Sequence, residues 1–105
     1  MSLDHGEVDT PLGTLRCTLR AAKEVSAYFG DYLDAFRKLA TFNHDAYVAI
    51  VAAGLGKSRK DVEKDVYEAG LPNLTESLSD YVGLLSNGGK PATVDDAGKP
   101  NTGEA

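Results

Sequence analysis

The chain has 105 residues, enough for one domain, and its 11 Lys and Arg against 16 Asp and Glu give a net charge of −5. This balance argues against nucleic acid or an anionic membrane as the main partner, because both select for clustered positive charge. The sequence has neither a run of about 18 apolar residues nor a basic-then-apolar leader, so we expect no membrane span and no signal peptide.

The N-terminal part of the chain alternates like a β-hairpin from Gly6 to Leu19. On the second strand, Leu15, Cys17 and Leu19 fall on one face, and polar residues fall on the other. The segment Pro11-Leu12-Gly13 supplies the reversal, since Pro fixes φ and Gly accepts positive φ. The pattern therefore predicts a hairpin whose apolar face includes Cys17 and Leu19.

Five short helices are expected after the hairpin, at about residues 20–29, 32–41, 44–53, 59–69 and 74–86. The first ends at Gly30, and the next four begin after the capping residues Asp31, Asn43, Ser58 and Asn73. Gly70 and Pro72 are expected to end the fourth helix, which has the weakest apolar stripe and the most charge.

Apolar spacing at helical period predicts which side chains of these helices form the core. The predicted core residues are Ala22, Val25, Phe29, Leu33, Phe36, Ala40, Ala46 or Tyr47, Ile50, Val51, Val62, Val66, Ala69, Leu74, Leu78, Tyr81, Val82 and Leu85. The predicted fold is α+β and mainly α, with an N-terminal β-hairpin followed by about five short helices.

The last stretch, residues 89–105, is rich in Gly and Pro and holds one large apolar residue, Val94. Such a segment cannot bury enough surface to offset its ordering entropy. The sequence predicts a single hairpin-plus-helical domain over residues 1–88 and a disordered C-terminal tail over residues 89–105.

The stretch 54–58 resembles two functional motifs. A phosphate-binding loop would need a glycine five positions before Gly56, where Val51 stands, so a helix end followed by a cap is the better interpretation. A helix-turn-helix remains an alternative, because basic residues could reach phosphates from this turn and the following helix. These residues are Lys57, Arg59, Lys60 and Lys64. Against DNA binding, the same helix carries Asp61, Glu63, Asp65 and Glu68.

No other pattern carries chemistry. His44 and Asp45 are adjacent, but the second histidine is His5 in the N-terminus, and a metal site needs three or four convergent ligands. The single cysteine, Cys17, cannot form an internal disulfide, which suits a reducing cytosol, and its inward position suggests an inert core thiol. We expect no enzyme activity, no metal and no cofactor.

Short motifs follow one another along the chain in a distinctive order. They are Gly6-Glu7-Val8, Gly13-Thr14-Leu15, Leu19-Arg20-Ala21-Ala22-Lys23-Glu24, Phe29-Gly30, Leu39-Ala40, Ala52-Ala53-Gly54-Leu55-Gly56, Asp61-Val62-Glu63, Gly70-Leu71 and Gly88-Gly89. In their order and spacing, over about residues 6–89, they resemble the small tail proteins of tailed phages and gene transfer agents. That family is labelled both gene-transfer-agent tail tube protein and tail assembly chaperone.

The two labels imply different proteins. Tail tube subunits build rings from β-sheet, whereas one hairpin among five helices fits a tail assembly chaperone. In such families a small helical protein in the host bacterial cytoplasm coats the helical tape measure protein until the tube polymerises around it. The resemblance thus implies a protein-binding role without catalytic residues, with the tape measure protein and also the tail tube protein as candidate partners. A homo-oligomer and a structural role in the particle are left open.

A partner of this kind would be bound through apolar side chains that lie off the predicted core stripes. The candidate contact residues are Tyr28, Tyr32, Leu55, Leu71 and Leu84. For each of them, completion of the intramolecular core is the alternative.

Overall fold

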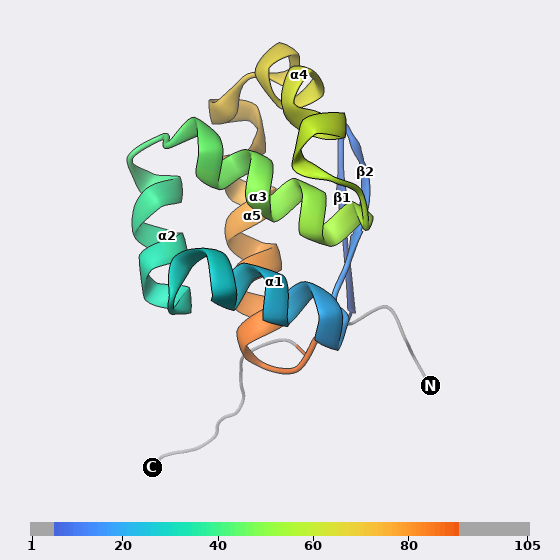
Figure 1. Ribbon diagram of the computed structural model, residues 1–105, viewed down its shortest axis with the longest axis vertical. Coiled ribbons are helices and arrows are strands. Elements are labelled where there is room, and N and C mark those ends of the chain that lie inside the picture. The colour runs from blue at the N-terminus through green and yellow to red at the C-terminus, as the bar shows by residue number, and fades with distance from the viewer. Residues whose placement is uncertain (1–5, 91–105) are drawn as a thin grey trace.

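A short hairpin leads directly into five helices in the computed structural model, which describes residues 6–90 (Figure 1). The strands are β1 (Glu7–Thr10) and β2 (Gly13–Arg16). The helices are α1 (Leu19–Phe29), α2 (Tyr32–Ala40), α3 (His44–Leu55), α4 (Arg59–Ala69) and α5 (Leu71–Ser86). The predicted architecture is confirmed, while the part of the predicted tail beyond residue 90 lies outside the described residues.

The two strands pair antiparallel, with Val8 opposite Leu15, around a two-residue turn. The Thr10 hydroxyl holds the turn, because it accepts the N–H of Leu12 at 3.1 Å and donates to the carbonyl of Gly13 at 2.7 Å. Leu15 is completely buried. The turn at Pro11 and Leu12 thus places the inner face of β2 on the helical core.

The hairpin ends earlier than its alternation predicts. Strand β2 stops at Arg16, and the Thr18 hydroxyl accepts the N–H of Ala21 at 3.0 Å as the N-cap of α1. Leu19 therefore stands in the first turn of α1 and is 73% exposed. The prediction that Leu19 faces the core is wrong, because the side-chain period changes from two to 3.6 at Thr18. Cys17 is partly buried and packs against the core.

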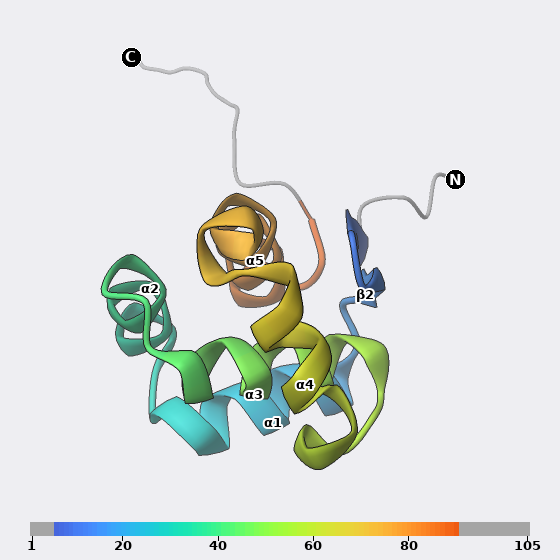
Figure 2. The ribbon, with the colours of Figure 1, turned by 90° about the horizontal axis from the view of Figure 1, so that it is seen from above.

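Helix α3 forms the centre of the molecule. It packs against α1, α2, α4, α5 and β2, and α5 crosses behind it in the view of Figure 1 (Figures 1 and 2). Every residue from Ala46 to Gly54 is buried. A helix that is apolar on all sides is buried on all sides, so the predicted stripe of α3 covers only part of its buried surface.

On α1 and α2 the buried side chains differ in part from the predicted apolar stripes. On α1 the fully buried alanine is Ala21, and Ala22 is partly buried beside it. On α2 the buried residues are Ala35 and Leu39, while Leu33 is 66% exposed. The predictions for Leu33 and Ala40 are wrong, and Phe36 is partly buried. The apolar residues of α2 form one broad face, and packing on α3 and α5 selects which part of that face is buried.

Helix α4 begins and ends as predicted, and α5 begins earlier. The Ser58 hydroxyl accepts the N–H of Asp61 at 3.2 Å and caps α4. Asn73 is no cap, since its side-chain amide donates to the carbonyl of Ala69 at 2.8 Å. Pro72 lies in the first turn of α5, where its missing N–H costs nothing. The five predicted core residues of α5 are all buried.

After α5 the chain folds back onto the hairpin. The N–H of Gly89 donates to the carbonyl of Leu84 at 2.7 Å, and Gly89 is buried. A Cβ at Gly89 would lie 3.4 Å from the Cβ of Cys17 and 3.7 Å from the Cα of Gly6. The ordered domain therefore extends at least to Lys90, past the boundary expected at residue 88.

Candidate functional site

A groove of about 730 Å³ lies between α1 and the corner where α3 turns into α4. Its floor is formed by the side chains of Ala49, Ala52 and Ala53 of α3. One wall comes from Arg20, Glu24, Ala27 and Tyr28 of α1. The other comes from Gly56, Lys57, Ser58 and Arg59 of the corner. The groove thus combines an apolar floor with charged walls.

The corner is held in a tight turn. Gly56 adopts a left-handed conformation with φ of 71°, and its N–H donates to the carbonyl of Ala52. The N–H of Lys57 donates to the same carbonyl at 3.0 Å. Helix α4 starts immediately after Ser58. The backbone of Lys57 and Arg59 is therefore fixed relative to the alanines of the floor.

The charges along the groove are arranged unevenly. On α1, Arg20 and Glu24 form an ion pair with 3.0 Å between Nε and Oε2. On the corner, the guanidinium carbon of Arg59 lies 5.1 Å from the centroid of the Tyr28 ring, a cation–π contact. Within residues 6–90, neither Lys57 nor Arg59 forms an ion pair. The corner wall therefore carries uncompensated positive charge.

The five predicted contact residues do not form one patch. Tyr28 is 39% exposed and lines the groove. Tyr32, Leu55 and Leu71 are partly buried and pack against the core, as the alternative interpretation of these residues expects. Leu84 is also partly buried. Partner binding through these residues stays a prediction, and Tyr28 is the residue with the most surface to offer.

Other large apolar side chains are more exposed than those predicted to bind a partner. They are Leu19, Leu33, Phe42 and Tyr67. Tyr67 is 75% exposed. Its exposure is predictable from the sequence, because Tyr67 follows the buried Val66 directly and therefore lies off the apolar stripe of α4. The exposure of Leu33 is not predictable in this way, because Leu33 belongs to the predicted apolar stripe of α2.

Phe42 and Tyr67 line a second, shallow hollow of about 360 Å³ between the α2–α3 loop and the start of α5. The His44 and Tyr67 rings are edge-on, with their centroids 6.3 Å apart. Phe42 has φ of 56°, a region that aromatic residues rarely adopt, and the bond from the N–H of Asn43 to the carbonyl of Lys38 closes the loop around it. The residues that line this hollow include three aromatic rings and no Asp, Glu, Lys or Arg.

In residues 6–90, no cluster of three or more His, Cys, Asp and Glu side chains is arranged to hold a metal ion. Burial raises the pKa of the Cys17 thiol. Burial also raises the pKa of Tyr81, with smaller effects from Cys17, Glu24 and Tyr32. Both groups are therefore held in their neutral forms at neutral pH.

Over the same described range, none of the helices has the length and apolar character needed to cross a membrane. No protein-family model, curated protein or solved structure matches this chain.

Proposed function

We propose that this protein is a phage-type tail assembly chaperone that binds and shields the helical tape measure protein during tail assembly. The observation that carries the proposal is the set of large apolar side chains left at the surface of a small, acidic domain. These are Leu19, Tyr28, Leu33, Phe42 and Tyr67. They come from α1, α2, α4 and the α2–α3 loop, so apolar contacts are available on several sides of the molecule.

Dispersed contacts of this kind suit a reversible shield. Full burial of one large apolar side chain contributes about 1.5–3 kcal/mol, and each exposed ring or leucine here could add only part of that amount. Several such contacts could cover the apolar stripes of a helical polymer and still release them when the tube forms. The net charge of −5 would keep the coated polymer in solution.

The small amount of sheet supports a chaperone rather than a subunit of the tube. Among residues 6–90 the only sheet has two strands of four residues each. A ring built from β-sheet needs extended strands with free edges that pair between subunits. The proposal places the protein in the bacterial cytoplasm, with the tape measure protein as the main partner and the tail tube protein as a second one.

Co-expression tests the proposal directly. The tape measure protein encoded next to this chain's gene is expressed alone and together with this chain, and its soluble fraction is measured by size-exclusion chromatography. We expect a soluble complex only in the presence of this chain. If the tape measure protein is equally insoluble in both cases, the proposal is wrong.

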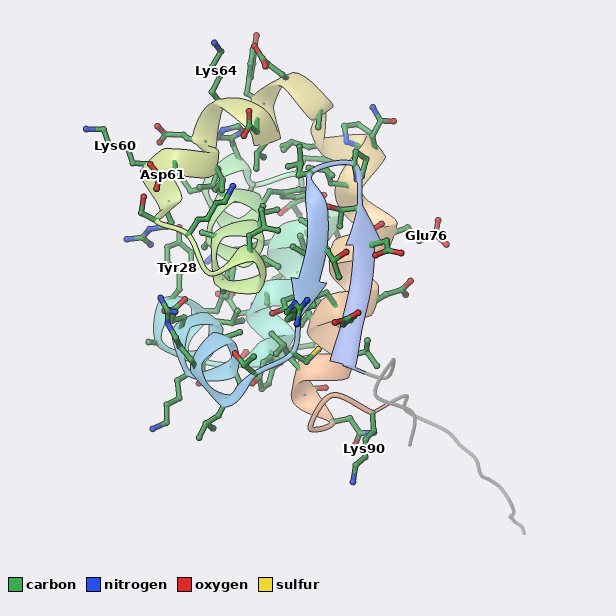
Figure 3. The ribbon with its side chains drawn as sticks, turned by 90° about the vertical axis from the view of Figure 1, so that its right-hand side faces the viewer. Tyr28, Lys60, Asp61, Lys64, Glu76 and Lys90 are labelled. Atoms are coloured by element: carbon green, nitrogen blue, oxygen red, sulfur yellow. The ribbon has the colours of Figure 1, made fainter. Side chains whose placement is uncertain are left out.

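A helix-turn-helix regulator is the second candidate, and one observation favours it. Lys60 and Lys64 project outward from α4, and Lys57, Arg59 and Lys60 form no ion pair within the described range (Figure 3). The acidic residues of α4 count against it, since they would approach the phosphates as well. A gel shift with duplex DNA at low salt tests this candidate, and the absence of a shift removes it.

A structural tail component is the third candidate. A chaperone leaves before the particle is complete, whereas a structural component stays. Detection of the chain in purified particles by mass spectrometry would favour the structural role, and its absence there favours the chaperone.

A further inference from the structure

We propose that the groove between α1 and the α3–α4 corner docks an acidic amphipathic helix of the partner. An apolar side chain of that helix would enter over Ala49, Ala52 and Ala53, and its flanking carboxylates would meet Lys57 and Arg59. The identification of the partner as the tape measure protein rests on the proposed function, whereas the chemistry of the occupant rests on the groove.

The shape of the groove suits an inserted side chain. Its volume of about 730 Å³ leaves ample room for one apolar side chain of a bound helix. The three floor alanines are almost completely buried, with 4–8% of their surface exposed, and Tyr28 stands beside them as a more exposed aromatic wall. The wall residues of α1 follow one another at helical spacing, so the groove runs between two helices, a geometry into which a third helix packs.

The charge of the groove selects an acidic occupant. Among residues 6–90, five basic side chains form ion pairs with carboxylates of this chain: Arg16, Arg20, Arg37, Lys38 and Lys64. Five other basic side chains in this range form none: Lys23, Lys57, Arg59, Lys60 and Lys90. Of these five, only Lys57 and Arg59 line the groove. Carboxylates of a bound helix would supply the missing counter-charges.

Arg59 is also held in position for such a contact. Its guanidinium lies over the Tyr28 ring, and within the described range it donates no hydrogen bond to this chain. Because the ring restrains the side chain, less conformational entropy is lost when the guanidinium binds a carboxylate through two parallel hydrogen bonds. Tyr28 thus serves both as an apolar wall and as a support for Arg59.

The occupant is tested with a displayed library of helical peptides of about 20 residues, a length at which docking can stabilise a helix. Each peptide has one apolar stripe, and the flanking positions vary among Glu, Lys and Gln. Selection against the full chain should enrich Glu over Lys at these positions. Selection against the Lys57→Ala, Arg59→Ala double variant should lose this enrichment. Equal recovery of Glu and Lys by the wild-type chain would overturn the proposal.

The selected peptide is then measured by fluorescence anisotropy against single variants. Arg59→Ala should weaken binding by about tenfold, the effect of one charge-assisted contact. Lys60→Ala removes the same charge from the next residue, which points away from the groove, and should leave the affinity nearly unchanged (Figure 3). If Lys60→Ala weakens binding as much as Arg59→Ala does, the contact is not in the groove. Circular dichroism checks that each variant is folded.

Three other occupants are outcomes of the same experiment, and each would overturn the proposal. If deletion of residues 91–105, which include Asp95 and Asp96, raises the affinity of the chain for the peptide, the groove belongs to that segment. Self-association that is abolished by Arg59→Ala would assign the groove to a second copy. Displacement of the peptide by duplex DNA would assign it to nucleic acid.

The failure of this proposal can be told apart from failure of the chaperone proposal. If the double variant keeps the tape measure protein as soluble as the wild-type chain does, the groove proposal fails and the chaperone stands. If the wild-type chain selects Glu-flanked helices but leaves the tape measure protein insoluble, the chaperone proposal fails and the groove keeps its specificity.

Discussion

The hydroxyl of Tyr81 donates a hydrogen bond of 2.5 Å to the carbonyl oxygen of Arg16, and so joins α5 to the end of β2. The two residues are 65 positions apart in the sequence. Tyr81 is completely buried, so this bond satisfies a polar group that has no access to water. It holds the strand end at the point where the hairpin gives way to α1.

Tyr81→Phe should therefore lower the free energy of unfolding by about 1 kcal/mol, since the folded chain loses one hydrogen bond between α5 and the end of β2. Urea denaturation measures the change. Tyr67→Phe is the matched control, because that hydroxyl is on an exposed ring and has no hydrogen-bond partner within residues 6–90. Equal stability of the Tyr81→Phe protein and the wild type would show that the bond contributes nothing.

Stability should fall as the pH rises above about 9. The pKa of Cys17 is raised above its usual value of 9.0 by burial, and that of Tyr81 above 10.0 by burial and by neighbouring acidic groups. In this range the unfolded chain releases both protons while the folded chain keeps them, so deprotonation favours unfolding. Urea midpoints measured between about pH 8 and about pH 10.5 should decrease, and Tyr81→Phe should flatten the decrease. A constant midpoint over this range would contradict the prediction.

Gly54→Ala should destabilise the protein by about 1–3 kcal/mol, because the new Cβ would overpack the core. That Cβ would lie 2.7 Å from the Cβ and 2.8 Å from the Cδ2 of Leu15. Gly83→Ala is the matched control: it also lies within a helix, its nearest contact is Phe36 at 4.0 Å, and it should stabilise by about 1 kcal/mol through helix propensity. Thermal unfolding of the two variants gives the comparison, and shifts of the same sign would contradict it.

Tyr67→Gln should reduce the amount of tape measure protein kept soluble in co-expression, because it removes an exposed ring that the proposed function uses. The free energy of unfolding should change by less than about 0.5 kcal/mol, as is usual for exposed positions. Glu63→Gln, at another exposed position of α4, should leave solubility unchanged. If both variants behave like the wild type in co-expression, Tyr67 is not a contact residue.

Local signals predicted most of the fold. Asp31, Asn43 and Ser58 cap helices as expected, since each side chain accepts an N–H three residues ahead. Turn and capping hydrogen bonds join residues that are close in the sequence, so they can be predicted from the sequence alone. Asn73 failed as a predicted cap because α5 begins at Leu71, where Pro72 is tolerated in the first turn.

The candidate groove was not predictable as a site. The sequence indicates that Tyr28 lies off the apolar stripe of its helix and that Lys57 and Arg59 are basic residues near a turn. Nothing in their spacing indicates that these residues meet. The contact between Arg59 and Tyr28 exists because α1 and the corner both pack against α3. Such a meeting depends on contacts far apart in the sequence.

The sequence by itself determined the order and kind of the elements: a hairpin, then five short helices, most of them bounded by local capping and turn residues. Only the tertiary structure decided which face of each helix is buried, as the exposure of Leu19 and Leu33 illustrates. The physical reason is that helix formation depends on local hydrogen bonds and capping, whereas the buried face of a short helix depends on the neighbours that pack against it.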